Sequence, residues 1–200
     1  MIATRMTTAF ESTVLQAINE RRSVRAYLPA VLDEIGIRML LDAAVRAPTA
    51  VHEEAWAFVV VQDAALMQRL SDRAKAGLVA RVEHHATDRG GHLPEEFLRP
   101  DFNIFHNAGT LIAICARPVS EFTVADCWLA AENLMLAAFA TGLGTCVIGS
   151  AVAAMNTPEG KADLGIPTDY TVVAPIVVGV PDGTGVPTPR KRPVILTWKR

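Results

Sequence analysis

The longest apolar segment of the sequence spans residues 128–150. Apolar residues recur there at helical spacing, the pattern breaks at Gly142 and Gly144, and a short β-branched run follows. This predicts a buried helix that leads directly into a buried strand. Residues 134–155 contain no charge, but three glycines, two threonines and a serine interrupt them, which argues against a transmembrane helix.

The same patterns predict helices and strands along the rest of the chain. Further helices are expected at residues 12–20, 33–46 and 64–87 and from Thr157, and further strands at residues 56–61, 109–116 and 171–180. Pro175 would place the last strand at a sheet edge or at a bulge. Thr123 and Asp126 have the spacing of a capping box for the helix that precedes Gly142. Residues 193–198 resemble a strand with no later element to pack against, so they could add to the sheet of a partner.

Composition narrows the class of protein. Two hundred residues, half of them apolar and a fifth charged, fit a single domain over residues 1–200. The net charge of -2 gives no indication of a nucleic-acid partner. Three cysteines without a CxxC pair predict reduced thiols in a cytoplasmic protein, and the first residues lack the apolar region of a signal peptide. The histidines have no zinc-like spacing, so no metal site is predicted.

Three segments carry candidate chemistry. Residues 21–25 read Arg-Arg-Ser-Val-Arg, which suits a phosphate group, although a solvated basic helix end is the alternative. His52, Glu53 and Glu54 precede a predicted strand, where they either face a ligand or form an exposed polar loop. Residues 91–106 are long and irregular, as expected of an active-site lid or a disordered loop. No dinucleotide fingerprint, P-loop or serine-nucleophile elbow is present.

Four segments, in this order, resemble the flavin-dependent nitroreductase family. Residues 21–25 resemble its RRSxR motif, and residues 47–56, APTAVHEEAW, resemble its APSAxNxQPW motif. Residues 130–149, AAENLMLAAFATGLGTCVIG, and residues 189–193, PRKRP, are also similar to family segments. The resemblance covers most of the chain, from Val14 to Arg192.

The resemblance implies an α+β fold in which a central, mostly antiparallel sheet is flanked by helices in a three-layer sandwich. It also implies a homodimer that exchanges C-terminal tails, here residues 181–200, and holds two FMN molecules at the subunit interface. By this similarity the FMN phosphate and ribityl chain would contact Arg21, Arg22, Ser23, Arg25, Arg190 and Arg192. The backbone N–H groups of Ile148 and Gly149 would face the flavin, and Pro48, Thr49 and His52 would approach it from the other subunit.

The implied activity is transfer of hydride from NADH or NADPH through FMN to a small acceptor such as a nitroaromatic or a quinone, in a ping-pong cycle. FMN would carry the chemistry, so no catalytic side chain is assigned. Phe97, Phe102 and Phe105 are candidate walls of the substrate site, or ordinary packing residues.

Two alternatives to this activity stay open. One is a family member with different flavin chemistry. The other is a homodimer of this fold that has lost FMN and serves binding or structure. The second is suggested by His52, Glu54 and Glu132, because each stands where the family usually has an amide side chain.

Overall fold

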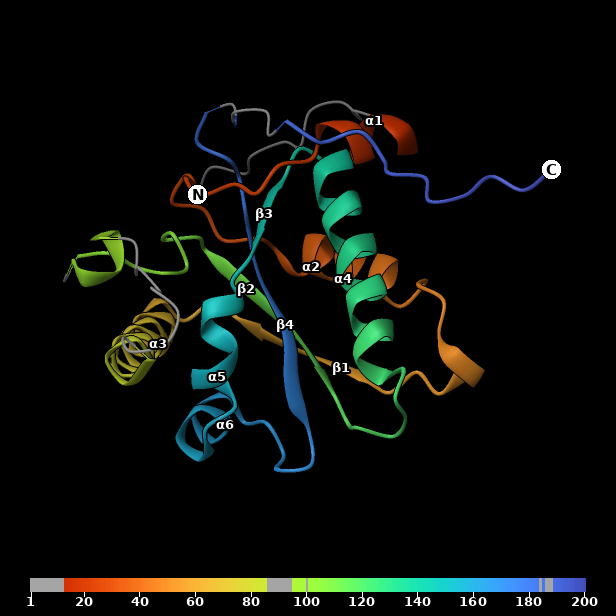
Figure 1. Cartoon of the computed structure of the whole chain (residues 1–200). Coiled ribbons are helices and arrows are strands. Elements are labelled where there is room, and N and C mark those ends of the chain that lie inside the picture. Colours follow the sequence, from red (N-terminus) through yellow and green to blue (C-terminus); the bar gives the residue numbers. More distant parts are fainter. Residues whose placement is uncertain (1–12, 86–94, 100, 184, 186–188) are drawn as a thin grey trace.

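A four-stranded antiparallel sheet crosses the middle of the molecule (Figure 1). The computed structural model describes residues 13–85, 95–99, 101–183, 185 and 189–200. The strands are β1 (Trp56–Val61), β2 (Thr110–Ala116), β3 (Gly144–Val147) and β4 (Thr171–Gly179), in the spatial order β1-β2-β4-β3. The α-helices are α1 (Val14–Glu20), α2 (Glu34–Ala44), α3 (Ala64–His85), α4 (Thr123–Ala140), α5 (Val152–Met155) and α6 (Pro158–Leu164). Short 3₁₀ helices are η1 (Ala50–His52), η2 (Glu95–Leu98) and η3 (Gly149–Ala151).

Helices cover both faces of the sheet. Along β2, where every residue is buried, alternate side chains point to opposite faces. Ile112 and Ile114 pack in one core cluster with α2 and α4, whereas Leu111 and Ala113 pack in the other with α3 and α5. The sheet is thus the middle of three layers, which confirms the predicted α+β sandwich.

The predicted starts of two helices, at residues 33 and 157, coincide with capping residues. Asp33 accepts a hydrogen bond from the Gly36 N–H at the start of α2, and Thr157 does the same for Gly160 at the start of α6. The break at Gly142 is also confirmed, since this residue has φ of 79° between α4 and β3. The short helix α5 has no counterpart among the predicted elements.

Two predictions that depended on distant residues were wrong. Pro175 lies in β4, an inner strand, opposite Ala113, although a bulge does follow nearby at the next residue pair of β2. Its carbonyl accepts from the Ile148 N–H just past the end of β3, so the missing proline N–H faces the side where the β3 ladder has ended. Thr123 and Asp126 form no capping box, because the N-cap of α4 is Phe122 and makes no side-chain cap.

The segment that contains the basic residues runs beside the end of the sheet. The Val24 N–H donates to the Thr145 carbonyl of β3, and the Leu28 N–H donates to the Val180 carbonyl beyond β4, each at 2.9 Å. Ser23 forms a parallel bridge with Thr145. The residues that follow α1 are therefore fixed along the outer edge of β3.

Gly144 makes this close approach possible. A Cβ atom at Gly144 would lie 2.7 Å from Val24 Cγ2, well inside ordinary contact distance. Valine has restricted side-chain rotamers, so it cannot easily turn away. Gly144 is thus required not only for the change from helix to strand but also for the packing of Val24 against β3.

We expect Gly144→Ala to destabilise the protein by about 1–3 kcal/mol, because the added methyl group meets Val24. Val24→Ala in the same chain should recover part of that loss, which a double-mutant cycle in urea would measure. Gly77→Ala is the matched control, since nothing lies within 4 Å of its Cβ position in α3. That control should stabilise by up to about 1 kcal/mol. Equal effects of the two alanines would contradict this packing.

The three cysteines are buried free thiols, as predicted. Burial raises the pKa of Cys115 to about 12 and the pKa of Cys127 to about 11. Burial also raises the pKa of Cys146, against the opposing effects of Arg25, Ser23 and Arg21. All three thiols are therefore held in the neutral form in the folded protein.

This burial predicts that the protein loses stability in alkali. Above about pH 8.5 the thiols of the unfolded chain ionise while the buried thiols keep their protons, so the unfolded state is favoured increasingly up to about pH 12. The urea concentration at the unfolding midpoint should decrease as the pH is raised from about 8 to about 10. Cys115→Ala should reduce this slope, whatever its effect at neutral pH. A midpoint that does not change over that interval would show that the thiols are accessible.

In the described part of the chain, no helix is long and apolar enough to span a membrane. The C-terminal residues 189–200 form no strand and extend away from the sheet, past α1 and α4 (Figure 1). Val194, Leu196 and Trp198 are 86%, 95% and 71% exposed. The apolar side chains of the tail are therefore not covered by the rest of this chain.

Candidate functional site

The edge made by β3 and residues 21–25 separates two pockets. The extended segment directs alternate side chains to opposite sides. Val24 packs against Gly144, and both residues line one pocket together with Arg22. Arg25 lines the other pocket with Cys146. The basic segment thus contributes charge to both sides of β3.

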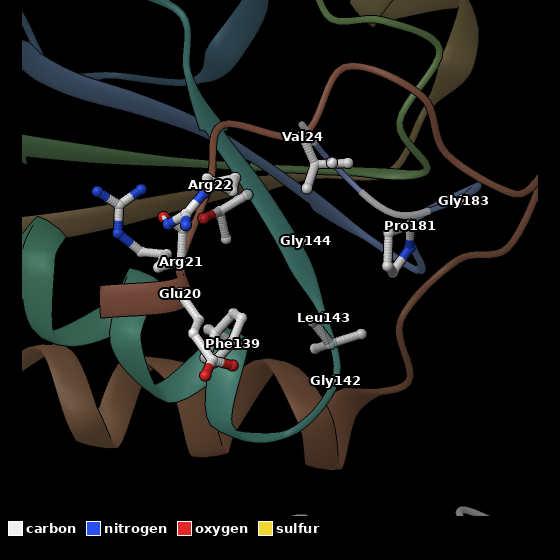
Figure 2. A pocket seen from close by; sticks show the side chains of 12 residues that line it. Glu20, Arg21, Arg22, Val24, Phe139, Gly142, Leu143, Gly144, Pro181 and Gly183 are labelled. Carbon is white, nitrogen blue, oxygen red and sulfur yellow. Dashed lines mark hydrogen bonds between the residues drawn. The ribbon is translucent and has the colours of Figure 1, made fainter. Parts of the chain in front are cut away.

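The first pocket, of about 380 Å³, surrounds the joint between α4 and β3 (Figure 2). Figure 2 shows Arg21 and Arg22 on one side of Gly144 and Pro181 on the other. Phe139 and Leu143 supply apolar surface next to these charges. Glu20, at the end of α1, adds a carboxylate to the same pocket.

Arg21 and Arg22 have different partners in this pocket. Arg22 Nη1 donates to the carbonyls of Asn19 and Arg21, at 2.7 and 2.9 Å, so it caps the last turn of α1. Arg21 instead lies beside α4, with its Nε 3.5 Å from Glu132 Oε1. In this arrangement Arg22 therefore stabilises the end of α1, which agrees with the alternative interpretation of residues 21–25 as a basic helix end.

The second pocket, of about 210 Å³, brings together residues that are far apart in the sequence. Arg25 comes from the basic segment, Gly149 from the start of η3, and Phe97 and Phe102 from the segment after α3. The two phenylalanine rings lie 5.2 Å apart, centroid to centroid. Three of the predicted site segments therefore meet in one cavity within a single chain.

The side chains around Cys146 define the electrostatics of this second pocket. Burial raises the Cys146 pKa, and the Arg25 guanidinium, the Ser23 hydroxyl and Arg21 partly oppose this rise. Ser23 and Arg25 are themselves exposed. A positive charge and a hydroxyl group thus remain accessible beside an uncharged thiol.

His106 belongs to this pocket and was missed in the sequence. Its ring packs edge-on against Phe102, with centroids 5.9 Å apart. His106 and Asn107 have φ values of 54° and 55°, a left-handed conformation that non-glycine residues seldom adopt and that often marks functional sites. The sequence pattern around His106 does not predict this backbone turn, so the sequence alone indicates an ordinary loop residue at His106.

Two of the predicted contacts are not available in this arrangement. The Ile148 N–H donates to the Pro175 carbonyl at 2.8 Å, so it does not face a ligand, although the neighbouring Gly149 is exposed. Phe105 is fully buried in the core with α3, so it is not a wall of the pocket. In both cases pairing with a distant element decides the orientation. Of the proposed lid, residues 91–94 and 100 lie outside the described part of the chain.

Pro48, Thr49 and His52 line neither pocket and lie far from the first one. Asp126, near the start of α4, is buried, and its two carboxylate oxygens accept from the Ala50 N–H at 3.3 and 3.2 Å. From Asp126 to Phe139 the helix rises by about 20 Å. The turn that carries His52 is therefore at the opposite end of α4 from the first pocket (Figure 1).

The same turn has an unusual backbone. Val51, His52 and Glu54 have φ values of 46°, 59° and 43°, and a β-branched residue such as Val51 strongly disfavours this region. Each such residue costs about 1–3 kcal/mol and keeps this conformation only where its surroundings fix it. The carboxylate of Asp126 is one such constraint. The spacing between Thr123 and Asp126 suggested a cap for the helix of Asp126, so the sequence did not predict its bond to Ala50.

Arg190 and Arg192 are exposed in the C-terminal tail and line neither pocket. The tail does pass close to the basic segment at one point, because Gly185 lies next to Arg22. A single chain thus brings together the segments of residues 21–25, 97–102 and 149, but not the segments of residues 48–52 and 190–192.

Comparisons with known proteins identify the family of the chain. The sequence model of the Nitroreductase family matches residues 18–180. A protein of Archaeoglobus fulgidus, provisionally named NADH dehydrogenase/NAD(P)H nitroreductase, is 30% identical over 172 residues, 84% of each chain. A nitroreductase of Bacteroides fragilis, solved with bound FMN, is 26% identical with a TM-score of 0.74, over 92% of this chain and 96% of its own.

A further solved structure has the same fold. A nitroreductase of Desulfitobacterium hafniense with bound FMN has a TM-score of 0.73 at 21% identity, over 89% of this chain and 94% of its own. The family model covers most of the chain, and the motifs at residues 21–25, 47–56 and 130–149 all lie within the matched range. The chain belongs to the Nitroreductase family.

Proposed function

We propose that the protein is an FMN-dependent oxidoreductase that transfers hydride from NADH or NADPH to a small acceptor such as a nitroaromatic or a quinone. The observation that carries this proposal is the second pocket, where Arg25, Gly149 and the pair Phe97 and Phe102 come together. The relatives solved with bound FMN support it.

The residues present suit the parts of FMN. Exposed Arg25 and Ser23 offer a charged donor and a hydroxyl, which match a phosphate and a polyol chain. The Gly149 N–H begins a helical segment, where the first backbone donors lack an intrahelical acceptor. Phe97 and Phe102 offer apolar surface to a planar ring.

When bound, FMN would supply the two-electron hydride chemistry. The side chains would then act by position and charge. Arg25 and Ser23, together with Arg21 of the same segment, would hold the phosphate end, and the Gly149 N–H would face the part of the ring where negative charge develops. Phe97 and Phe102 would keep water away from the reacting face. Donor and acceptor would use that one face in turn, which is a ping-pong order.

A homodimer would complete the site. The turn with Pro48, Thr49 and His52 is about 20 Å along α4 from the first pocket and lines neither pocket, so it would serve the flavin of a second copy. Apolar side chains are exposed on α1, on α4 and in the tail, and such uncovered surface typically marks an interface. The tail with Arg190 and Arg192 would be fixed when it packs on the second copy.

We expect the purified protein to bind FMN and Arg25→Ala to weaken this binding by about 10- to 100-fold, because a hydrogen bond to a charged group contributes about 1.5–3 kcal/mol. Fluorescence titration with FMN measures the dissociation constant. Arg38→Ala is the matched control, since Arg38 is exposed on α2 and pairs with Glu34 there.

Two results would decide against the assignment. Unchanged affinity in Arg25→Ala would remove Arg25 from the phosphate site. Failure of the unaltered protein to bind FMN at all would favour the alternative in which this homodimer fold serves binding or structure without a flavin.

The tail provides a separate test of the dimer. Leu196 is 95% exposed in the single chain, so a charge there should do nothing to a monomer. If the tail packs on a second copy, Leu196→Asp should weaken the dimer by at least about tenfold, since burial of a leucine contributes about 1.5–3 kcal/mol. Sedimentation velocity gives the dimer fraction. Thr168→Asp, another exposed position, should have no effect, and equal sedimentation of all three proteins would contradict the role of the tail.

A further inference from the structure

The contact between Arg21 and Glu132 brings a carboxylate to the edge of the basic cluster. Glu132 Oε1 lies 3.5 Å from Arg21 Nε, and the two side chains are 46% and 21% exposed. This separation is an ion pair without a close hydrogen bond. Arg21 lines the pocket beside β3 and also influences the Cys146 thiol from there. The carboxylate thus acts on a guanidinium of the basic segment that lines the first pocket.

The surroundings of Arg21 leave Glu132 as its one ion-pair partner among the described residues. Arg22 donates to the backbone carbonyls of Asn19 and Arg21 and does not contact Glu132. The other carboxylate of the pocket, Glu20, accepts instead from the side-chain amide of Gln16 at 3.2 Å. Glu132 therefore reduces the positive charge that Arg21 offers to a ligand.

We propose that Glu132 lowers the affinity of this site for the phosphate group of the flavin, so that FMN is an exchangeable coenzyme and not a permanently bound one. The inference rests on the proposed function, because it concerns the same basic segment. A phosphate beside Arg21 would carry close to two negative charges and would be repelled by Glu132.

A competing effect has the opposite sign. The ion pair also holds the Arg21 side chain in place, which would help a ligand bind. Exposed pairs of this kind contribute little, because water screens them and both long side chains lose freedom. Repulsion of a doubly charged phosphate is therefore the larger effect, and its removal is expected to tighten FMN binding about fivefold.

The test compares FMN with riboflavin, which has the same ring and sugar chain but no phosphate. Dissociation constants for both are measured by fluorescence titration for the unaltered protein and for Glu132→Gln, which keeps the shape and removes the charge. The FMN dissociation rate is measured by displacement. Glu34→Gln is the charge-matched control, since that carboxylate pairs with Arg38 on the exposed side of α2.

The proposal predicts that Glu132→Gln binds FMN about fivefold more tightly and releases it more slowly, while riboflavin binding and the Glu34→Gln protein are unchanged. It is overturned if Glu132→Gln binds FMN equally well or less well, or if riboflavin gains by the same factor. In those cases the proposed function would stand, because FMN still binds. If neither protein binds FMN or riboflavin, the proposed function and this inference fail together.

Discussion

The backbone pairing between residues 23–28 and the end of the sheet is the interaction on which the site depends. Two N–H groups, of Val24 and Leu28, donate to carbonyls at β3 and beyond β4. The pairing needs a residue without a side chain opposite Val24, and Gly144 supplies it. Without this contact the basic segment would be a free loop after α1, and its charges would have no fixed position relative to η3.

The pairing of residues 23–28 with the sheet also decides on which side of β3 each side chain of the basic segment lies. Because an extended segment alternates its side chains, Val24 packs on the joint between α4 and β3 while Ser23 and Arg25 stay near Cys146. Glu132 adds a negative charge from the middle of α4. The far end of the same helix fixes the turn of His52 through Asp126. One helix, α4, therefore contacts both the basic segment and the turn of His52.

Local signals in the sequence predicted most elements, but long-range pairing decided the details of the site. Asp33 and Thr157 cap their helices, and the glycines after α4 mark the change to β3, because all of these act on adjacent residues. Asp126, Pro175 and Ile148 were misread, since each is bonded to a residue on a distant segment. Phe105 and His106 are neighbours in the chain, yet one is in the core and the other lines a pocket. No spacing rule separates such a pair.

The most direct test of the central claim is rapid mixing of the FMN-loaded protein with NADH or NADPH in the absence of oxygen, followed by addition of a quinone. The account predicts that the visible absorbance of the bound flavin is lost on the first mixing and returns on the second, with no requirement that donor and acceptor be present together. A bound flavin that keeps its absorbance with both nicotinamides would contradict the proposed reaction, even where binding of FMN itself is shown.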